Sequence, residues 1–182
     1  MNRDFQQEGI GQIGWRFDER GYEVRHEEDG DVSVQKLREI KNLIELEELV
    51  RRDIGGKYRP LRGEKNLVRG WFYSAKSAKD LREVVEVIYP GAIGNWAAQQ
   101  KGKLSVVGWK EAAKKQTGRV QALIDGGEKA VEAVEKTLCL TRCGKTPHWA
   151  GKIAIVRSGR VPFVCIEPCP VFWETANSLF NS

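Results

Sequence analysis

The sequence contains no apolar stretch that approaches the roughly 20 residues needed to span a bilayer, so we expect neither a membrane span nor a membrane partner. Its beginning, MNRDFQQEGIGQIGWRF, also lacks the apolar core of a secretory signal. These two absences predict a cytoplasmic protein, and structural disulfides are disfavoured in the cytoplasm. The hydrophobic content of 41% is ordinary for a folded globular protein.

The sequence also lacks a strong excess of either charge. It has 30 lysine and arginine residues against 25 aspartate and glutamate residues, a net charge of +5. A moderately basic chain can bind nucleic acid, acidic proteins or anionic small molecules. We expect most of these charges to form a solvated surface, and a nucleic-acid contact through Arg59, Arg62 and Arg69 is the alternative.

The pattern of apolar residues predicts an α+β fold, in which residues 1–84 form a small α/β module with antiparallel strands. Ser77 has the side chain of a good N-cap, and Pro90 followed by Gly91 should end the helix that Ser77 begins. The elements expected in this module are a hairpin with its turn at 18–21, a helix over 34–53, a strand over 67–73 and the helix after Ser77.

Residues 85–182 are predicted to form a second, helix-rich domain that carries all the cysteines and a β-hairpin. The Ser158-Gly159 pair lies between two β-rich runs and is typical of a hairpin turn. The expected helices cover residues 92–101, 109–124 and 128–138, with a short closing helix in PVFWETANSLF.

Cysteine is scarce, and its four copies fall in two motifs of the same spacing, CLTRC (Cys139, Cys143) and CIEPC (Cys165, Cys169). We expect Cys139 to end a helix, with Cys143 in the loop beyond it. Cys165 should end the second arm of the hairpin, and Cys169 should begin the closing helix. The hairpin would then fold back and bring both motifs into one site.

Four interpretations compete for these cysteines. Disulfides fit poorly with the expected compartment, and unrelated buried thiols would not repeat one spacing. Zinc tolerates ligand spacings of this kind. A [4Fe–4S] cluster takes one thiolate per iron, and an apolar aromatic shell limits solvent access to it. The residues favour the cluster, with zinc as the alternative, because Pro170 follows Cys169, Arg142 and Lys145 can offset the negative charge, and aromatic residues surround the motifs.

The second half of the chain resembles the C-terminal region of sirohydrochlorin cobaltochelatase-like (CbiX-type) proteins. The motifs that carry this resemblance are YPGAIGNWAAQQKGKL, KKQTGR, CLTRC and CIEPC. In that family a chelatase portion is followed by a small stabilising α/β domain and a four-cysteine [4Fe–4S] domain. The resemblance implies that the cluster ligands are Cys139, Cys143, Cys165 and Cys169.

Chelatase activity is not carried over by this resemblance, because the chain has only the histidines His26 and His148 and no room for the chelatase domains. A Cys143–His148 nucleophile pair is set aside, since a cysteine bound to a cluster is unavailable, and we expect His148 at the surface or beside the site. The GIGQIGW segment lacks the strand and helix of a dinucleotide loop and is interpreted as a flexible N-terminal segment.

The sequence therefore predicts a [4Fe–4S] protein that acts in electron transfer or redox sensing. We expect a redox or chelatase-like protein partner, a role accessory to tetrapyrrole metal chelation, and no catalysis by this chain alone. The alternative is a nucleic-acid-binding or protein-interaction module with a structural zinc or cluster. Tyr89, Trp96 and Trp109 would suit a stacking platform, but aromatic residues on helices are more often core, and we expect them there.

Overall fold

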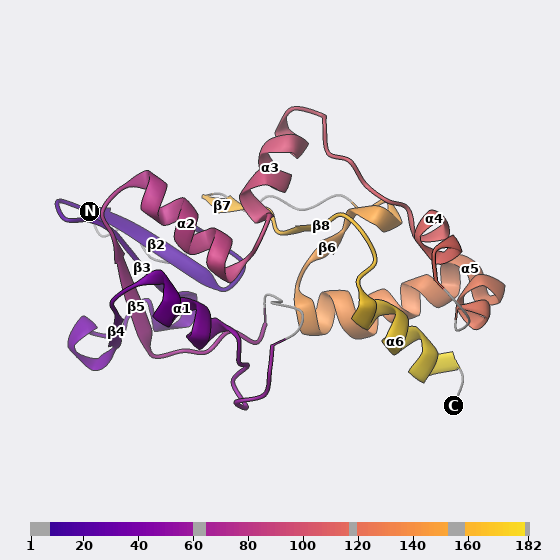
Figure 1. Cartoon of the computed structure of the whole chain (residues 1–182), viewed down its shortest axis with the longest axis horizontal. Helices are drawn as coiled ribbons and strands as arrows, with labels where there is room; N and C mark the ends of the chain where they lie inside the picture. The colour runs from indigo at the N-terminus through magenta and orange to yellow at the C-terminus, as the bar shows by residue number, and fades with distance from the viewer. Residues whose placement is uncertain (1–7, 60–64, 117–119, 153–158, 181–182) are drawn as a thin grey trace. The chain divides into compact units, whose positions relative to one another are not determined.

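The computed structural model describes residues 8–59, 65–116, 120–152 and 159–180. The chain forms two compact units, which comprise Met1–Gly94 with Ile155–Pro162 and Asn95–Ala154 with Phe163–Ser182 (Figure 1). Helices and strands are both present, with a sheet in the first unit and mostly helices in the second, so the predicted α+β fold class is confirmed. Within the described residues, no helix is long and apolar enough to cross a membrane.

The first unit is built on a six-stranded sheet with the strand order β4-β5-β3-β2-β1-β7. The four central strands are antiparallel, as predicted, and each edge strand joins its neighbour in parallel. The strands are β1 (Gly9–Ile10), β2 (Ile13–Asp18), β3 (Gly21–His26), β4 (Arg38–Ile40), β5 (Trp71–Ala75) and β7 (Arg160–Val161).

Two helices, α1 (Leu43–Val50) and α2 (Ala78–Ile88), pack against each other and against strands β3, β4 and β5. Ser77 caps α2 by accepting a hydrogen bond from the Asp80 amide at 3.2 Å, which confirms the predicted N-cap. Both helices bury an apolar stripe against the sheet. The core residues here are Val24, Ile40, Leu46, Val50, Trp71, Ala75, Leu81, Val84, Val85 and Ile88.

The predicted helix over residues 34–53 is wrong in its first half. The chain there forms a short 3-10 turn, Val34–Lys36, and then strand β4, and only Leu43–Val50 is α-helical. β4 pairs in parallel with β5, with Ile40 opposite Tyr73. Pairing with a strand distant in sequence therefore overrides the local helical spacing.

The interpretation of GIGQIGW as a flexible segment is wrong. This segment forms a buried hairpin in which Gly9 pairs with Gly14. Gly11 turns the chain at φ +54°, and a Cβ there would lie 2.7 Å from the Tyr89 ring. Tyr89 also accepts a hydrogen bond from the Gln12 amide at 2.9 Å. Contacts with Tyr89, just after α2, and with β7 hold this segment in place, and both come much later in the chain, so its local sequence gives no sign of its burial.

The second unit is mainly helical, and α6 packs along both α5 and the π-helix η3. The predicted helix over 109–124 is divided, because α4 ends at Lys114 and α5 begins at Gln121. Gly127, at φ +55°, then kinks α5. The elements are α3 (Ala92–Gln100), which begins in the first unit, α4 (Trp109–Lys114), α5 (Gln121–Val134), η3 (Glu135–Cys143), β6 (Thr146–Pro147), η4 (His148–Ala150), β8 (Val164–Cys165) and α6 (Pro170–Phe180).

The first arm of the predicted hairpin falls largely on residues 153–158 and lies outside the described residues. Its second arm, Arg160–Val161, is strand β7, which pairs with β1 in the sheet of the first unit. Arg160 fixes this edge because its guanidinium forms an ion pair with Glu27 at 3.1 Å and donates to the carbonyls of Gly11 and Ile13.

His26 makes the stability of the first unit depend on pH. Its side chain is fully buried, Nδ1 accepts from the Glu28 amide at 3.1 Å, and Nε2 has no partner among the described residues. Burial lowers the pKa of His26 below its ordinary value of 6.5, with Arg69 and Arg59 acting in the same direction and Asp29 and Glu28 opposing them. The unfolded chain therefore takes up this proton at a higher pH than the folded one, and stability falls as the pH drops below about 6.5.

We expect the urea midpoint of the protein to fall between pH 7.5 and pH 5.5, and to fall less in His26→Gln, which does not titrate. Urea unfolding at both pH values in the two proteins measures the difference. An equal pH dependence in the variant would show that His26 does not carry the effect.

Candidate metal centre

All four cysteines lie in the second unit as free thiols. Cys139 and Cys143 are each only 6% exposed, whereas Cys165 and Cys169 are half-buried. Cys169 immediately precedes α6, close to its predicted place at the start of the closing helix, but Cys165 ends the separate strand β8 rather than an arm of a hairpin. The CLTRC pair therefore lies deeper in the unit than the CIEPC pair.

The prediction that the first cysteine pair lies in a loop is wrong, because the helix continues through both cysteines of CLTRC as the π-helix η3. The Thr141 hydroxyl donates to the carbonyl of Lys136, five residues earlier, which matches the wider turn of a π-helix. Gly144, at φ 68°, then ends the helix. Since residues four apart lie on one side of a helix, Cys139 and Cys143 share a face.

The two motifs are brought together by the pairing of β6 with β8. Thr146 lies opposite Val164 and Pro147 opposite Cys165, in parallel. β6 begins only three residues after Cys143, so this ladder places CIEPC beside the end of η3. The predicted convergence of the motifs is therefore observed, although a parallel strand pair, rather than the hairpin itself, produces it.

The cysteine thiols interact electrostatically as one group. Burial raises the pKa of Cys139, and the neighbouring Cys165, Cys143 and Cys169 raise it further. Burial also raises the pKa of Cys143 to about 11, with Cys169 adding to the rise and Lys145 opposing it. These thiols are therefore protonated at neutral pH unless a metal stabilises the thiolates, and metal binding must release protons.

The surroundings of the thiols are apolar and aromatic, as predicted. The rings of Trp149 and Phe172 lie 4.7 Å apart and those of Phe172 and Trp173 lie 5.1 Å apart, all buried. Burial raises the pKa of the Cys165 thiol, and the predicted cation Lys145 lowers it. The Lys145 Nζ lies 4.6 Å from the centroid of the Phe163 ring. This shell limits solvent access to the cysteines while keeping a positive charge beside them.

Glu135 also lies close to the site, which sequence reasoning missed. It is 2% exposed, its pKa is raised by burial, and Lys152 lies 3.7 Å away as its ion-pair partner. Its charge acts on Cys139, four residues further along η3. This four-residue spacing was the available signal, but a glutamate on a charged helix is usually solvated.

The chemistry of these donors fits an iron–sulfur group: four free thiols, a buried aromatic shell and a compensating cation. In the part of the chain that the structure describes, no three His, Cys, Asp or Glu side chains form a group that could hold a single metal ion. His148 is half-buried, and burial lowers its pKa, so it is neutral beside this shell.

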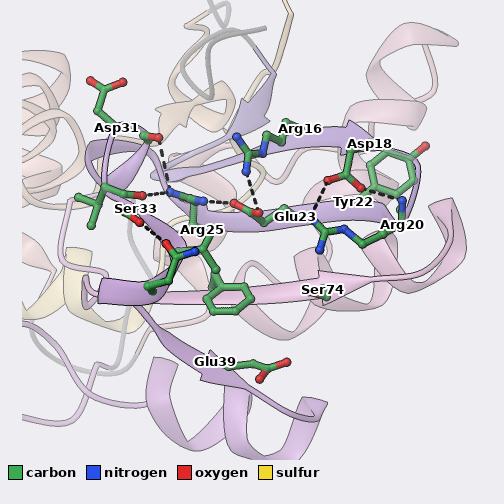
Figure 2. A pocket seen from close by; sticks show the side chains of 16 residues that line it. Arg16, Asp18, Arg20, Tyr22, Glu23, Arg25, Asp31, Ser33, Glu39 and Ser74 are labelled. Atoms are coloured by element: carbon green, nitrogen blue, oxygen red, sulfur yellow. Dashed lines mark hydrogen bonds and ion pairs between the residues drawn. The ribbon is translucent and has the colours of Figure 1, made fainter. Parts of the chain in front are cut away.

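The second candidate site is a cavity of about 740 Å³ in the first unit (Figure 2). It lies on the sheet face opposite the residues packed against the helices, and its floor carries an Arg16–Glu23–Arg25 ion-pair network. Arg25 is 1% exposed and donates to the carbonyls of Asp29 at 2.9 Å and Val32 at 2.6 Å. Because these charges bind parts of the protein itself, the network serves to hold the fold.

Two of the three arginines predicted for the nucleic-acid alternative bind other residues of the protein. Arg59 is 1% exposed and donates to Asn66 at 2.7 Å. Arg69 is paired with Glu28 and Asp29 at 2.7 and 3.1 Å, and Arg62 lies outside the described residues.

Two of the three aromatic residues considered for a stacking platform are buried. Tyr89 is 1% and Trp109 is 6% exposed, which confirms them as core residues. Trp96 is half-buried on α3.

Two family matches divide the chain. Residues 2–100 match the family described as the DR2241 stabilising domain, and residues 101–178 match a 4Fe-4S iron-sulfur cluster binding domain. No curated protein matches the chain. These matches confirm the resemblance to the stabilising and [4Fe–4S] domains of chelatase-like proteins.

The chain is also similar to a solved structure, DR2241 from Deinococcus radiodurans, with a TM-score of 0.83 and 26% sequence identity. That protein is described as a multi-domain protein with structural similarity to chelatases but also with two additional novel domains. The match covers 97% of this chain and 39% of that chain, so the present chain spans less than half of its relative. The chain therefore belongs to the family of the DR2241 stabilising domain, followed here by an iron–sulfur cluster binding domain.

Proposed function

We propose that the chain binds one [4Fe–4S] cluster through Cys139, Cys143, Cys165 and Cys169 and serves in electron transfer or redox sensing. The observation that carries this proposal is the gathering of the four free thiols in the unit that matches a cluster-binding family. Their mutual effect on the pKa of Cys139 supports a single site rather than two. A reducing compartment such as the cytoplasm would keep all four thiols free for this role.

When bound, such a cluster accepts and releases one electron at a time. Cys139, Cys143, Cys165 and Cys169 would supply one thiolate to each iron, so this ligand set would leave no iron open for a substrate. The buried side chains of Trp149, Phe172 and Trp173 would limit solvent access to the cluster, and Lys145 would offset the negative charge of the thiolates. These roles suit an electron carrier or sensor better than an enzyme.

The proposed setting is metal chelation into a tetrapyrrole, with a chelatase-like domain or protein as the partner. The support is the similarity to DR2241, which is itself described as structurally similar to chelatases. The present chain corresponds to 39% of that protein, and we assign no chelatase chemistry to its own residues.

Anaerobic purification of the whole chain tests the cluster. We expect a brown protein with a broad visible absorption, about four iron and four sulfide per chain, and a reversible one-electron couple. A colourless protein with one zinc per chain would overturn the cluster. A brown protein without a reversible couple would retain the cluster but refute electron transfer and redox sensing.

A further inference from the structure

The strongest unexplained feature beside the cysteines is a buried hydrogen-bond donor on Trp149. This residue lies on η4, which contacts the strand β8 that ends at Cys165. It is 4% exposed, and its indole Nε1 is buried without a hydrogen bond of standard geometry to any described residue. Native proteins rarely leave such a donor unpaired, because its lost hydration is not recovered.

The Trp149 N–H acts on one particular sulfur. Its side chain lies within hydrogen-bonding reach of the Cys165 sulfur, at the end of the strand that η4 contacts. A neutral thiol is a weak acceptor, whereas a thiolate accepts a charge-assisted hydrogen bond. The geometry of the donor therefore suits the ligated state of Cys165 better than its free state.

The neighbouring His148 also has a buried ring nitrogen, Nε2, without a partner in the described part of the chain. A neutral imidazole nitrogen is a donor in one tautomer and an acceptor in the other. The indole N–H of Trp149 can only donate, so its role is unambiguous.

We propose that Trp149 is the residue that tunes the cluster, by donating its indole N–H to the metal-bound sulfur of Cys165. The inference rests on the cluster proposed above and adds to it a positioning residue that acts through a ligand. A donor to a ligand sulfur stabilises the reduced cluster, which is the more negative state, more than the oxidised one. Trp149 therefore raises the reduction potential and favours acceptance of an electron.

The test compares Trp149→Phe with Trp173→Phe in the whole, cluster-containing chain. Both substitutions keep an aromatic ring in the same buried cluster, but Trp173 has no buried, unpartnered donor among the described atoms. Electrode titration should show a lower potential for Trp149→Phe. At a fixed ambient potential, its ratio of reduced to oxidised cluster should fall about threefold to tenfold, where tenfold corresponds to about 59 mV for one electron.

If the Trp149→Phe chain fails to assemble a cluster, a measurement on the unmodified protein still tests the inference. With tryptophan labelled by ¹⁵N at the indole nitrogen, the reduced paramagnetic protein should show hyperfine coupling from one indole nitrogen. Absence of coupling, an unchanged potential in Trp149→Phe, or equal shifts in both variants would each overturn the inference. A wild-type chain without iron and sulfide would instead refute the proposed function itself, and this inference with it.

Discussion

Replacing Cys165 by serine should abolish the visible absorption of the protein and unfold its second unit. Cys165 joins β8 to the CIEPC turn and its thiol interacts with those of the other motif. Metal binding is coupled to folding in small metal-bound domains, where it contributes about 10 kcal/mol or more. Without the cluster, the remaining buried thiols keep their protons and no longer connect η3 to β8.

Absorption spectroscopy, iron and sulfide counts, and proteolysis of the second unit measure this effect. Leu140→Ser is a matched control, because Leu140 lies between the first two cysteines but is 49% exposed. This control should keep its colour and its four irons. A Cys165→Ser protein with the full iron and sulfide content would exclude Cys165 as a ligand.

Replacing Arg25 by methionine should destabilise the first unit by about 3–5 kcal/mol, the usual result of breaking a buried ion pair from one side. Arg25 is 1% exposed, forms an ion pair with Glu23, and holds the carbonyls of Asp29 and Val32. Methionine fills much of the same volume but donates no hydrogen bond. The loss therefore reports on the charge and the donors rather than on packing.

Urea unfolding followed by the tryptophans measures the change, with Arg20→Met as the control. The Arg20 side chain is 90% exposed and lies 3.7 Å from Asp18, so its removal should cost less than about 1 kcal/mol. Equal effects of the two substitutions would show that the Arg25 network is dispensable.

The sequence predicted elements whose causes are local. The Asp18–Gly21 turn and the Ser77 cap are observed, because a turn and a cap depend on a few neighbouring residues. Strand β4 was missed because its partner, Trp71 to Tyr73, lies some 33 residues away in the chain and has no local signature. The buried hairpin at Gly9 was missed for the same reason, since Arg160 holds it.

The sequence predicted which residues form the site but not how they are arranged. Repetition of one cysteine spacing was enough to unite the two motifs, and the structure brings them together. The π-helix was not foreseen, because the sequence pattern predicts a helix only as far as residue 138 and a loop beyond it. Trp149 was named only as part of an apolar shell, since sequence alone cannot show that an indole nitrogen is buried without a partner.

The position of β7 determines whether the two domains of this chain can be expressed separately. The segment that links the two cysteine motifs crosses into the first unit, adds an edge strand beside β1, and returns at Phe163. A fragment ending at residue 100 would lose that strand and expose the backbone edge of β1, which is a template for pairing with another chain. The stabilising domain expressed by itself should therefore self-associate, and the two domains would be exchangeable between proteins only as a pair.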